Sequence, residues 1–194
     1  ATERRGPTLA APGGLDRELR GHGLRHPRAD SSGRLVIRVC FVCLGNICRS
    51  PTAAGVMRHL VNAAKLDDAT LVESRGTSGW HAGEAPDRRA RAAGLRRRIE
   101  IGGAARQFER ADFDGFDYVV AMDGENFAHL RAIAPPSALT KLFLLRQFDP
   151  AAPPEAAVPD PYYGGDAEFD EVVELCLTAC HGLLDHIRRE HGLH

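Results

Sequence analysis

The first clear hydrophobic pattern in the chain is the run 35–42, where apolar side chains are nearly continuous and often β-branched. Runs of this kind are typical of parallel strands buried on both faces. A short loop follows. From residue 51 onward, apolar positions recur at helical spacing in Ala54, Met57, Val61 and Ala64. The order strand, loop, helix predicts the first half of a βαβ unit.

The alternation of strands and helices continues along the chain. We expect further strands at 70–74, 117–122 and 139–145, and helices at 87–98, 125–133 and 166–189. This order predicts an α/β fold, a small open four-stranded parallel sheet with helices on both faces in a three-layer, Rossmann-like arrangement. Such sheets bind ligands at the carboxyl ends of their strands, and Cys43 lies at the end of the first one.

Residues 1–34 have a different composition from the rest. They are rich in Gly, Pro, Arg and Ser and show no period that would bury a face. We therefore expect a disordered tail over 1–34, whose arginines serve either as an electrostatic docking arm or only as a solvated extension. Residues 35–194 then form one domain, because a chain of 194 residues fits a single domain of ~100–200 residues.

Composition and charge narrow the class of partner. With 43% hydrophobic residues and a net charge of -1, the chain has no global positive field for nucleic acid or an anionic membrane, and we expect neither as a partner. No apolar run approaches the ~18 residues of a membrane span, and the N-terminus lacks the apolar segment of a signal peptide. Five cysteines, an odd number, argue against a disulfide framework and for a reducing compartment, so we expect a cytoplasmic protein.

The loop after the first strand carries the candidate chemistry. Five residues separate Cys43 from Arg49. Gly45 and Asn46 lie between them, and both tolerate the positive φ that an anion-binding nest requires. The following helix directs its positive N-terminus at the same place, and the planar fork of Arg49 suits two oxygens of a phosphoryl group. We therefore expect a phosphate-binding loop.

A cysteine in this positive field is expected to be a thiolate and a nucleophile, although an isolated cysteine beside a strand is more often a buried, inert thiol. Ser50 has two possible roles. It can donate a hydrogen bond to the Cys43 sulfur, or it can cap a helix that begins at Pro51.

Three segments of the chain resemble one known family. Residues 42–51, VCLGNICRSP, resemble the signature of the low-molecular-weight protein tyrosine phosphatases. Residues 76–81, GTSGWH, resemble the recognition loop of that family, and residues 160–164, DPYYG, resemble its acid loop. The resemblance spans about 36–187. It implies that 35–194 form a catalytic domain that hydrolyses phosphotyrosine in proteins and aryl phosphates, releases inorganic phosphate, and needs no cofactor or metal.

The resemblance also implies roles for single residues. Cys43 attacks phosphorus to form a phosphocysteine, Arg49 holds the phosphoryl oxygens, and Asp160 is the general acid and then the general base. Phosphate-binding positions are Leu44, Gly45, Asn46, Ile47, Cys48 and Ser50, and aromatic walls are provided by Trp80, Tyr162 and Tyr163.

Some of these positions allow a second interpretation. Trp80 and Tyr162 could simply pack within their loops, and Tyr163 could be a surface tyrosine open to phosphorylation. Cys48 is either a redox partner that protects Cys43 through a reversible disulfide, as the family implies, or a packing residue.

One departure from the family concerns Asn46. The family often has a histidine before Ala-Arg-Gln, which supports this asparagine, whereas Gly103 and Ala104 precede that sequence here. We therefore expect Asn46 to lack this histidine partner and the loop to be less preorganised. Asp123 and Asn126 resemble family positions too, with a supporting structural role.

Four alternatives remain open. Cys40 and Cys43 together with Cys176 and Cys180 match the ligand count of a structural zinc site, although core packing also explains them. Arsenate reductases share the fold and the loop but need further redox cysteines, and no cysteine lies between Cys48 and Cys176. The phosphoarginine-specific branch tends to carry Thr in place of Ile47, which favours tyrosine. A non-catalytic phosphate or phosphotyrosine reader would need neither Cys43 nor Asp160.

Overall fold

The computed structural model describes residues 28–29, 33 and 35–193. At its centre are four parallel strands, β2 (Leu35–Cys43), β3 (Thr70–Gly76), β4 (Tyr118–Ala121) and β5 (Leu142–Leu144). Their order across the sheet is β3, β2, β4, β5, so β2 and β4 are interior strands. The expected four-stranded parallel sheet is confirmed.

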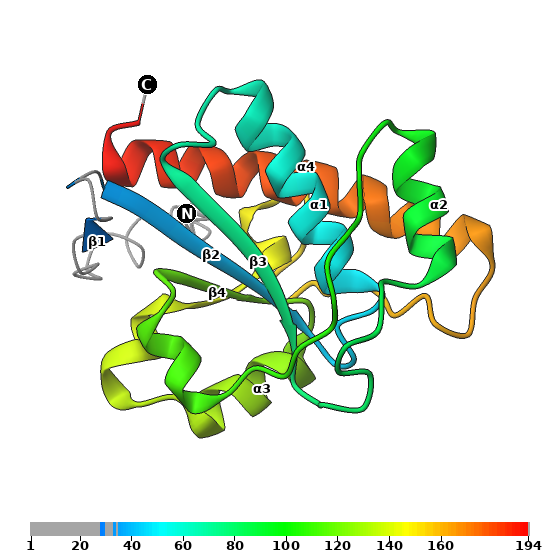
Figure 1. Cartoon of the computed structure of the whole chain (residues 1–194), viewed down its shortest axis with the longest axis horizontal. Helices are drawn as coiled ribbons and strands as arrows, with labels where there is room; N and C mark the ends of the chain where they lie inside the picture. The colour runs from blue at the N-terminus through cyan, green and yellow to red at the C-terminus, as the bar shows by residue number, and fades with distance from the viewer. Residues whose placement is uncertain (1–27, 30–32, 34, 194) are drawn as a thin grey trace, which may run out of the picture.

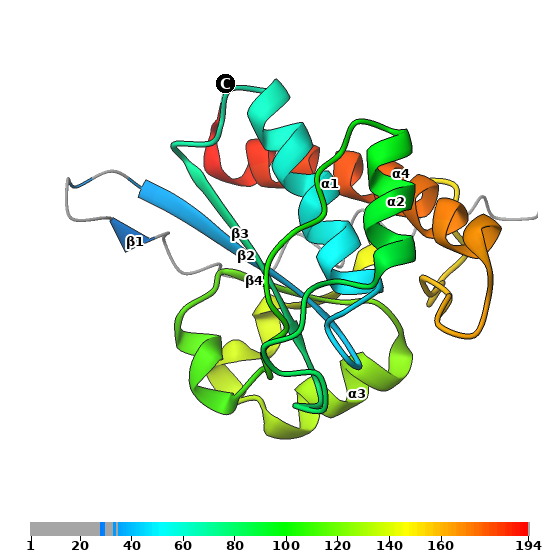
Figure 2. The same ribbon diagram turned by 45° about the vertical axis from the view of Figure 1, so that its right-hand side comes forward.

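Helices cover both faces of this sheet (Figure 1). The helices α1 (Arg49–Ala63), α2 (Arg88–Arg96) and α4 (Asp166–His191) lie on one face, and α3 (Gly124–Ile133) lies on the other, as Figure 2 also shows. The expected three-layer arrangement is therefore confirmed. None of the helices in the described part of the chain is long and apolar enough to cross a membrane.

The β2 strand is buried on both of its faces. Val39 and Phe41 belong to the core beneath α1 and α4, while Cys40 and Val42 belong to the core beneath α3. Successive strand residues point to opposite faces, so a strand with helices on both sides needs apolar residues at every position. This explains the continuous apolar run at the start of the domain.

A further short strand, β1 (Arg28–Ala29), pairs antiparallel with the beginning of β2. The hydrophobic pattern does not predict a strand of two residues. It falls within the segment 1–34 that we expect to be a disordered tail. Most of that segment lies outside the described residues.

The last predicted strand is the element that differs most from expectation. Of the range 139–145, only Leu142–Leu144 is a strand, and it is flanked by the 3-10 helices η3 (Pro136–Lys141) and η4 (Leu145–Phe148). The prediction was wrong at both ends. Pro136 at the start of η3 has a φ suited to a helical turn, and β5 pairs with only three residues of the short β4 strand.

The topology brings the site together at one edge of the sheet. The parallel strands β2, β3 and β4 all end there, so the loops that follow them meet. The loop 44–48 leads from β2 into α1, and the long segment between η4 and α4 carries Asp160 to the same edge.

Candidate active site

The loop 44–48 turns sharply between β2 and α1. Asn46 adopts a φ of 56°, in the left-handed region that asparagine tolerates better than most residues. Gly45 does not have a positive φ, so its smallness serves another purpose. A Cβ at Gly45 would lie 3.0 Å from Cδ2 of His81, and glycine therefore allows the recognition loop to approach closely.

Asn46 holds this loop from within. Its Nδ2 donates hydrogen bonds to the hydroxyls of Ser50 (3.0 Å) and Ser74 (2.8 Å). Its Oδ1 accepts one from the backbone N–H of Arg106 (2.9 Å). The missing histidine therefore does not leave Asn46 unpaired, because a backbone amide just after the glycine-rich segment donates to its side-chain oxygen.

Ser50 lies directly beneath the candidate nucleophile. Its Oγ is 3.0 Å from Cys43 Sγ and 3.1 Å from the carbonyl oxygen of Arg75, and the side chain is fully buried. The helix α1 begins at Arg49, with Cys48 as its N-cap residue and no side-chain capping bond. The prediction that Ser50 caps the helix was wrong, and contact with sulfur is the arrangement found.

Arg49 lies between two carboxylates. One Nη group pairs with Asp123, and the other donates to Asp160 Oδ2 at 2.6 Å. Asp123 also caps α3, since its Oδ1 accepts from the N–H of Asn126 at 2.7 Å, which agrees with the expected supporting role. Burial acts to lower the pKa of Arg49, but the negative charges of Cys43, Asp160 and Asp123 outweigh it and raise that pKa. Arg49 therefore stays charged.

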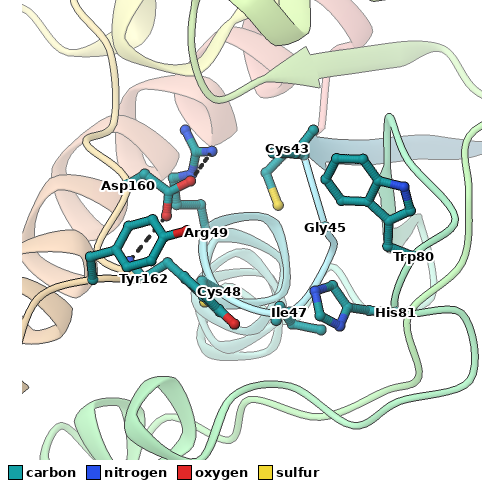
Figure 3. A pocket seen from close by; sticks show the side chains of 11 residues that line it. Cys43, Gly45, Ile47, Cys48, Arg49, Trp80, His81, Asp160 and Tyr162 are labelled. Atoms are coloured by element: carbon teal, nitrogen blue, oxygen red, sulfur yellow. Dashed lines mark hydrogen bonds and ion pairs between the residues drawn. The ribbon is translucent and has the colours of Figure 1, made fainter.

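These side chains meet in a pocket of about 350 Å³ (Figure 3). The sulfur of Cys43 points toward the loop, with Arg49 and Asp160 on one side of it and Trp80 and His81 on the other. Most of the predicted site residues line this pocket, together with His81, which was not assigned a role: Cys43, Leu44, Gly45, Ile47, Cys48, Arg49, Trp80, His81, Asp160, Tyr162 and Tyr163. Asn46 and Ser50 lie beneath the pocket and brace it.

The aromatic residues stand at the rim of the pocket. Trp80 is 77% exposed and Tyr163 is 97% exposed, while Tyr162 is 41% exposed. The rings of Tyr162 and Tyr163 meet edge to face, with centroids 5.0 Å apart. The rim therefore offers apolar ring surface on two sides of an open mouth. The position of His81, next to Trp80 in the sequence, was the one signal that could have indicated its place there.

Cys48 is a buried neighbour of Cys43 in the same pocket. Burial, with the nearby charge of Asp87 and then those of Cys43 and Asp160, raises the pKa of the Cys48 thiol to about 12. At neutral pH this thiol remains protonated. Its chemistry is therefore distinct from that of a nucleophile.

The remaining cysteines do not form a metal site with Cys43. Cys40 points into the core beneath α3, whereas Cys43, Cys176 and Cys180 belong to the core on the opposite face of the sheet. All five cysteines are free, and in the described part of the chain no cluster of three or more His, Cys, Asp or Glu side chains could hold a metal ion. Core packing accounts for Cys40, Cys176 and Cys180.

Known proteins are similar to this chain in both sequence and fold. The family model for low molecular weight phosphotyrosine protein phosphatases matches residues 38–193. The low molecular weight protein-tyrosine-phosphatase of Streptomyces coelicolor is 44% identical over 158 residues, which cover 80% of this chain and 96% of that relative.

Solved structures agree with the sequence comparison. A protein tyrosine phosphatase from Entamoeba histolytica superposes with a TM-score of 0.76 at 36% identity, covering 80% of this chain and 98% of that one. The drosophila arginine phosphatase DARP superposes with a TM-score of 0.73 at 31% identity, covering 78% and 98%. With a family match over residues 38–193, the chain belongs to the low molecular weight phosphotyrosine protein phosphatases.

Proposed function

We propose that the protein hydrolyses phosphotyrosine in proteins through a covalent phosphocysteine on Cys43. The observation that carries this proposal is the shared pocket of Cys43, Arg49 and Asp160, in which a hydroxyl lies 3.0 Å from the sulfur. A phosphoryl group placed over Cys43 would have a nucleophile, a planar cation and a carboxyl group within reach.

In the first step, the Cys43 thiolate attacks phosphorus. The S–P bond forms, the bond from phosphorus to the phenolic oxygen breaks, and Asp160 gives its proton to that oxygen. The proton is needed because the leaving phenol has a pKa of ~10. Arg49 and the loop hold the phosphoryl oxygens, and the positive end of α1 favours their charge.

In the second step, water attacks the phosphocysteine. Asp160, now a carboxylate, takes a proton from this water while the S–P bond breaks and inorganic phosphate forms. As the S–P bond breaks, the Ser50 hydroxyl, which lies 3.0 Å from the sulfur and donates to the Arg75 carbonyl oxygen in the resting protein, turns its proton toward the sulfur and stabilises the regenerated thiolate. All electrons and protons are accounted for by the enzyme, substrate and water, so the reaction consumes no co-substrate.

The rim supports an aryl substrate. The ring surfaces of Trp80 and Tyr162 flank the mouth of the pocket and can stack on a phenol ring. Phosphoarginine is a second candidate substrate, because the arginine phosphatase DARP is similar to this chain over 78% of its length. Parallel assays of a phosphotyrosine peptide and a phosphoarginine peptide distinguish the two, and we expect a higher kcat/KM for the phosphotyrosine peptide.

Arsenate reduction, and phosphate binding without catalysis, are less well supported. A reductase relay needs accessible cysteines beyond the loop, and Cys176 and Cys180 have no solvent exposure. A protein that only binds phosphate or phosphotyrosine would need neither the Cys43 sulfur nor the Asp160 carboxyl, yet both line the pocket.

The experiment is hydrolysis of an aryl phosphate in the presence of a metal chelator. We expect the native protein to turn over, Cys43→Ser to be inactive, and Asp160→Ala to be slowed by about 10²- to 10⁴-fold. Asp114→Ala is the matched control, since Asp114 is an exposed carboxylate outside the pocket. Binding of phosphate by a reduced native protein without any turnover would overturn the proposal.

Redox control by Cys48 is part of the proposal. A peroxide would oxidise the Cys43 thiolate to a sulfenic acid, and the Cys48 thiol would condense with it to give a disulfide and water. Support comes from the position of both cysteines in one pocket. Without that disulfide, further peroxide oxidises the sulfenic acid to a sulfinic acid that a dithiol cannot reduce. After prolonged peroxide treatment we therefore expect a dithiol to restore the native protein but not Cys48→Ser; equal recovery of the two would contradict this role.

We also propose a cytoplasmic location, because five free cysteines suit a reducing compartment. Cell fractionation tests this, and recovery of the protein outside the cell would contradict it.

A further inference from the structure

Arg89 joins the two loops that carry the catalytic groups, although sequence reasoning gave it no role. It lies in the first turn of α2, which begins directly after Asp87. The backbone N–H of Asp87 donates to the carbonyl oxygen of Ile47 at 2.7 Å. The start of α2 is thereby fixed to the loop that follows Cys43.

The guanidinium of Arg89 is held in one orientation by Asp87. Nε donates to Asp87 Oδ1 at 3.1 Å, and Nη2 donates to Asp87 Oδ2 at 2.8 Å. The hydrogen bond from Arg89 lowers the pKa of Asp87, so this carboxylate stays charged near neutrality. The guanidinium carbon also lies 4.5 Å from the ring centroid of the buried Phe169, within the range of a cation–π contact.

From this position, Arg89 holds the acid loop. Nη1 donates to the carbonyl oxygen of Gly164 at 2.9 Å, and Nη2 donates to that of Tyr162 at 3.0 Å. The backbone N–H of Tyr162 in turn donates to Asp160 Oδ1 at 3.2 Å. A continuous set of contacts therefore runs from the nucleophile loop to the carboxyl group of Asp160.

We propose that Arg89 is a positioning residue for the reaction, which sets where the Asp160 carboxyl stands relative to Cys43 and so governs proton transfer to the leaving group. This inference rests on the proposed function. Four of the five guanidinium N–H groups are engaged. Lysine has three donors without a planar arrangement and cannot reproduce this set.

The test compares leaving groups. Phenyl phosphate needs a proton on its leaving oxygen much more than p-nitrophenyl phosphate does, because phenolate is the stronger base. For Arg89→Ala we expect kcat/KM to fall by about 10- to 100-fold with phenyl phosphate and by no more than about threefold with p-nitrophenyl phosphate, since displacing a catalytic group by about 1 Å costs up to ~10²-fold. The rate of Cys43 alkylation should not change.

Arg88→Ala is the matched control, because Arg88 is the exposed neighbour on the same helix. If Arg89 has only a structural role, Arg89→Ala lowers kcat/KM equally for both substrates, and this result overturns the inference. A loss of kcat/KM in Arg89→Ala that is no greater than the loss in Arg88→Ala also overturns it. If Arg89→Ala does not fold, the losses of kcat/KM with phenyl phosphate and with p-nitrophenyl phosphate are compared in Arg89→Lys instead. Failure of the proposed function is distinguishable, since the native protein would then turn over neither substrate.

Discussion

The backbone N–H of Arg106 donates a hydrogen bond to the side-chain oxygen of Asn46 at 2.9 Å. This bond joins a segment after α2 to the centre of the candidate phosphate loop. It leaves Nδ2 of Asn46 free to bond Ser50 and Ser74, so a single amide orients the serine that contacts Cys43. A histidine at the position of Gly103 is therefore not required for Asn46 to be fully partnered.

Removing this amide should slow catalysis. In Asn46→Ala, Ser50 loses a donor and the loop loses its connection to Arg106, and we expect kcat to fall by about 10- to 100-fold through misplacement of the sulfur. Asn46→Gly is the matched control for backbone conformation, because glycine accepts the φ of 56° without the amide. Equal kcat values for Asn46→Gly and the native protein would contradict the role of these hydrogen bonds.

Cys48 should resist alkylation at neutral pH. With its pKa raised to about 12, only about one Cys48 side chain in 10⁵ is a thiolate at pH 7. We expect iodoacetate to inactivate the protein by labelling Cys43, with Cys48→Ser inactivated at the native rate. Peptide mapping by mass spectrometry provides the check. Preferential labelling of Cys48 would show that the assignment of the nucleophile is reversed.

Gly182 should not tolerate a side chain. A Cβ at this position in α4 would overlap the carbonyl oxygen of Phe148 in η4, so Gly182→Ala must push the two elements apart. We expect a loss of about 1–3 kcal/mol in the free energy of unfolding, measured with urea. Gly124→Ala serves as control because no atom lies within 4 Å of its added Cβ. If the urea midpoint of Gly182→Ala equals that of the native protein, α4 and η4 do not pack as described.

Stability should decrease on mild acidification. Burial lowers the pKa of His186 and that of His191, while Glu190 acts in the opposite direction on both. The unfolded chain then binds protons more readily than the folded one. The free energy of unfolding is therefore highest above the unfolded pKa of ~6.5 and falls as the pH drops through the folded values.

His186→Phe should reduce this pH dependence, because the ring of His186 already packs against Phe143 and Phe148. Urea unfolding at a series of pH values measures the effect, with the exposed His59→Gln as control. If both variants follow the native pH profile, the half-buried His186 is not its source.

The sequence was sufficient for the parts of the site that one segment specifies. Cys43 ends a strand, and Arg49 and Ser50 begin the helix that follows the loop, so the order of strand, loop and helix brings the three together. Asp160 could be placed only through the family resemblance, because it lies 111 positions after Arg49 and the ion pair that joins them is not a local property.

Contacts between distant segments account for what the sequence did not indicate. The partner of Asn46 is a backbone amide, which carries no signature in the residue type. Arg89 looks like one more charge in the arginine-rich helix, and its contacts with Tyr162 and Gly164 depend on how α2 meets the acid loop. The Ser50 hydroxyl satisfied the sequence rule for an N-cap, yet the helix begins at Arg49 with Cys48 as its N-cap, which places Ser50 inside the first turn.

The most direct test of the central claim is to trap the covalent intermediate. The reduced native protein is mixed with p-nitrophenyl phosphate, quenched rapidly in acid and analysed by mass spectrometry after digestion. We predict a phosphoryl group on Cys43 during turnover, and no phosphorylated peptide from Cys43→Ser. Sustained turnover with the phosphoryl group on another residue, or on none, would contradict the account.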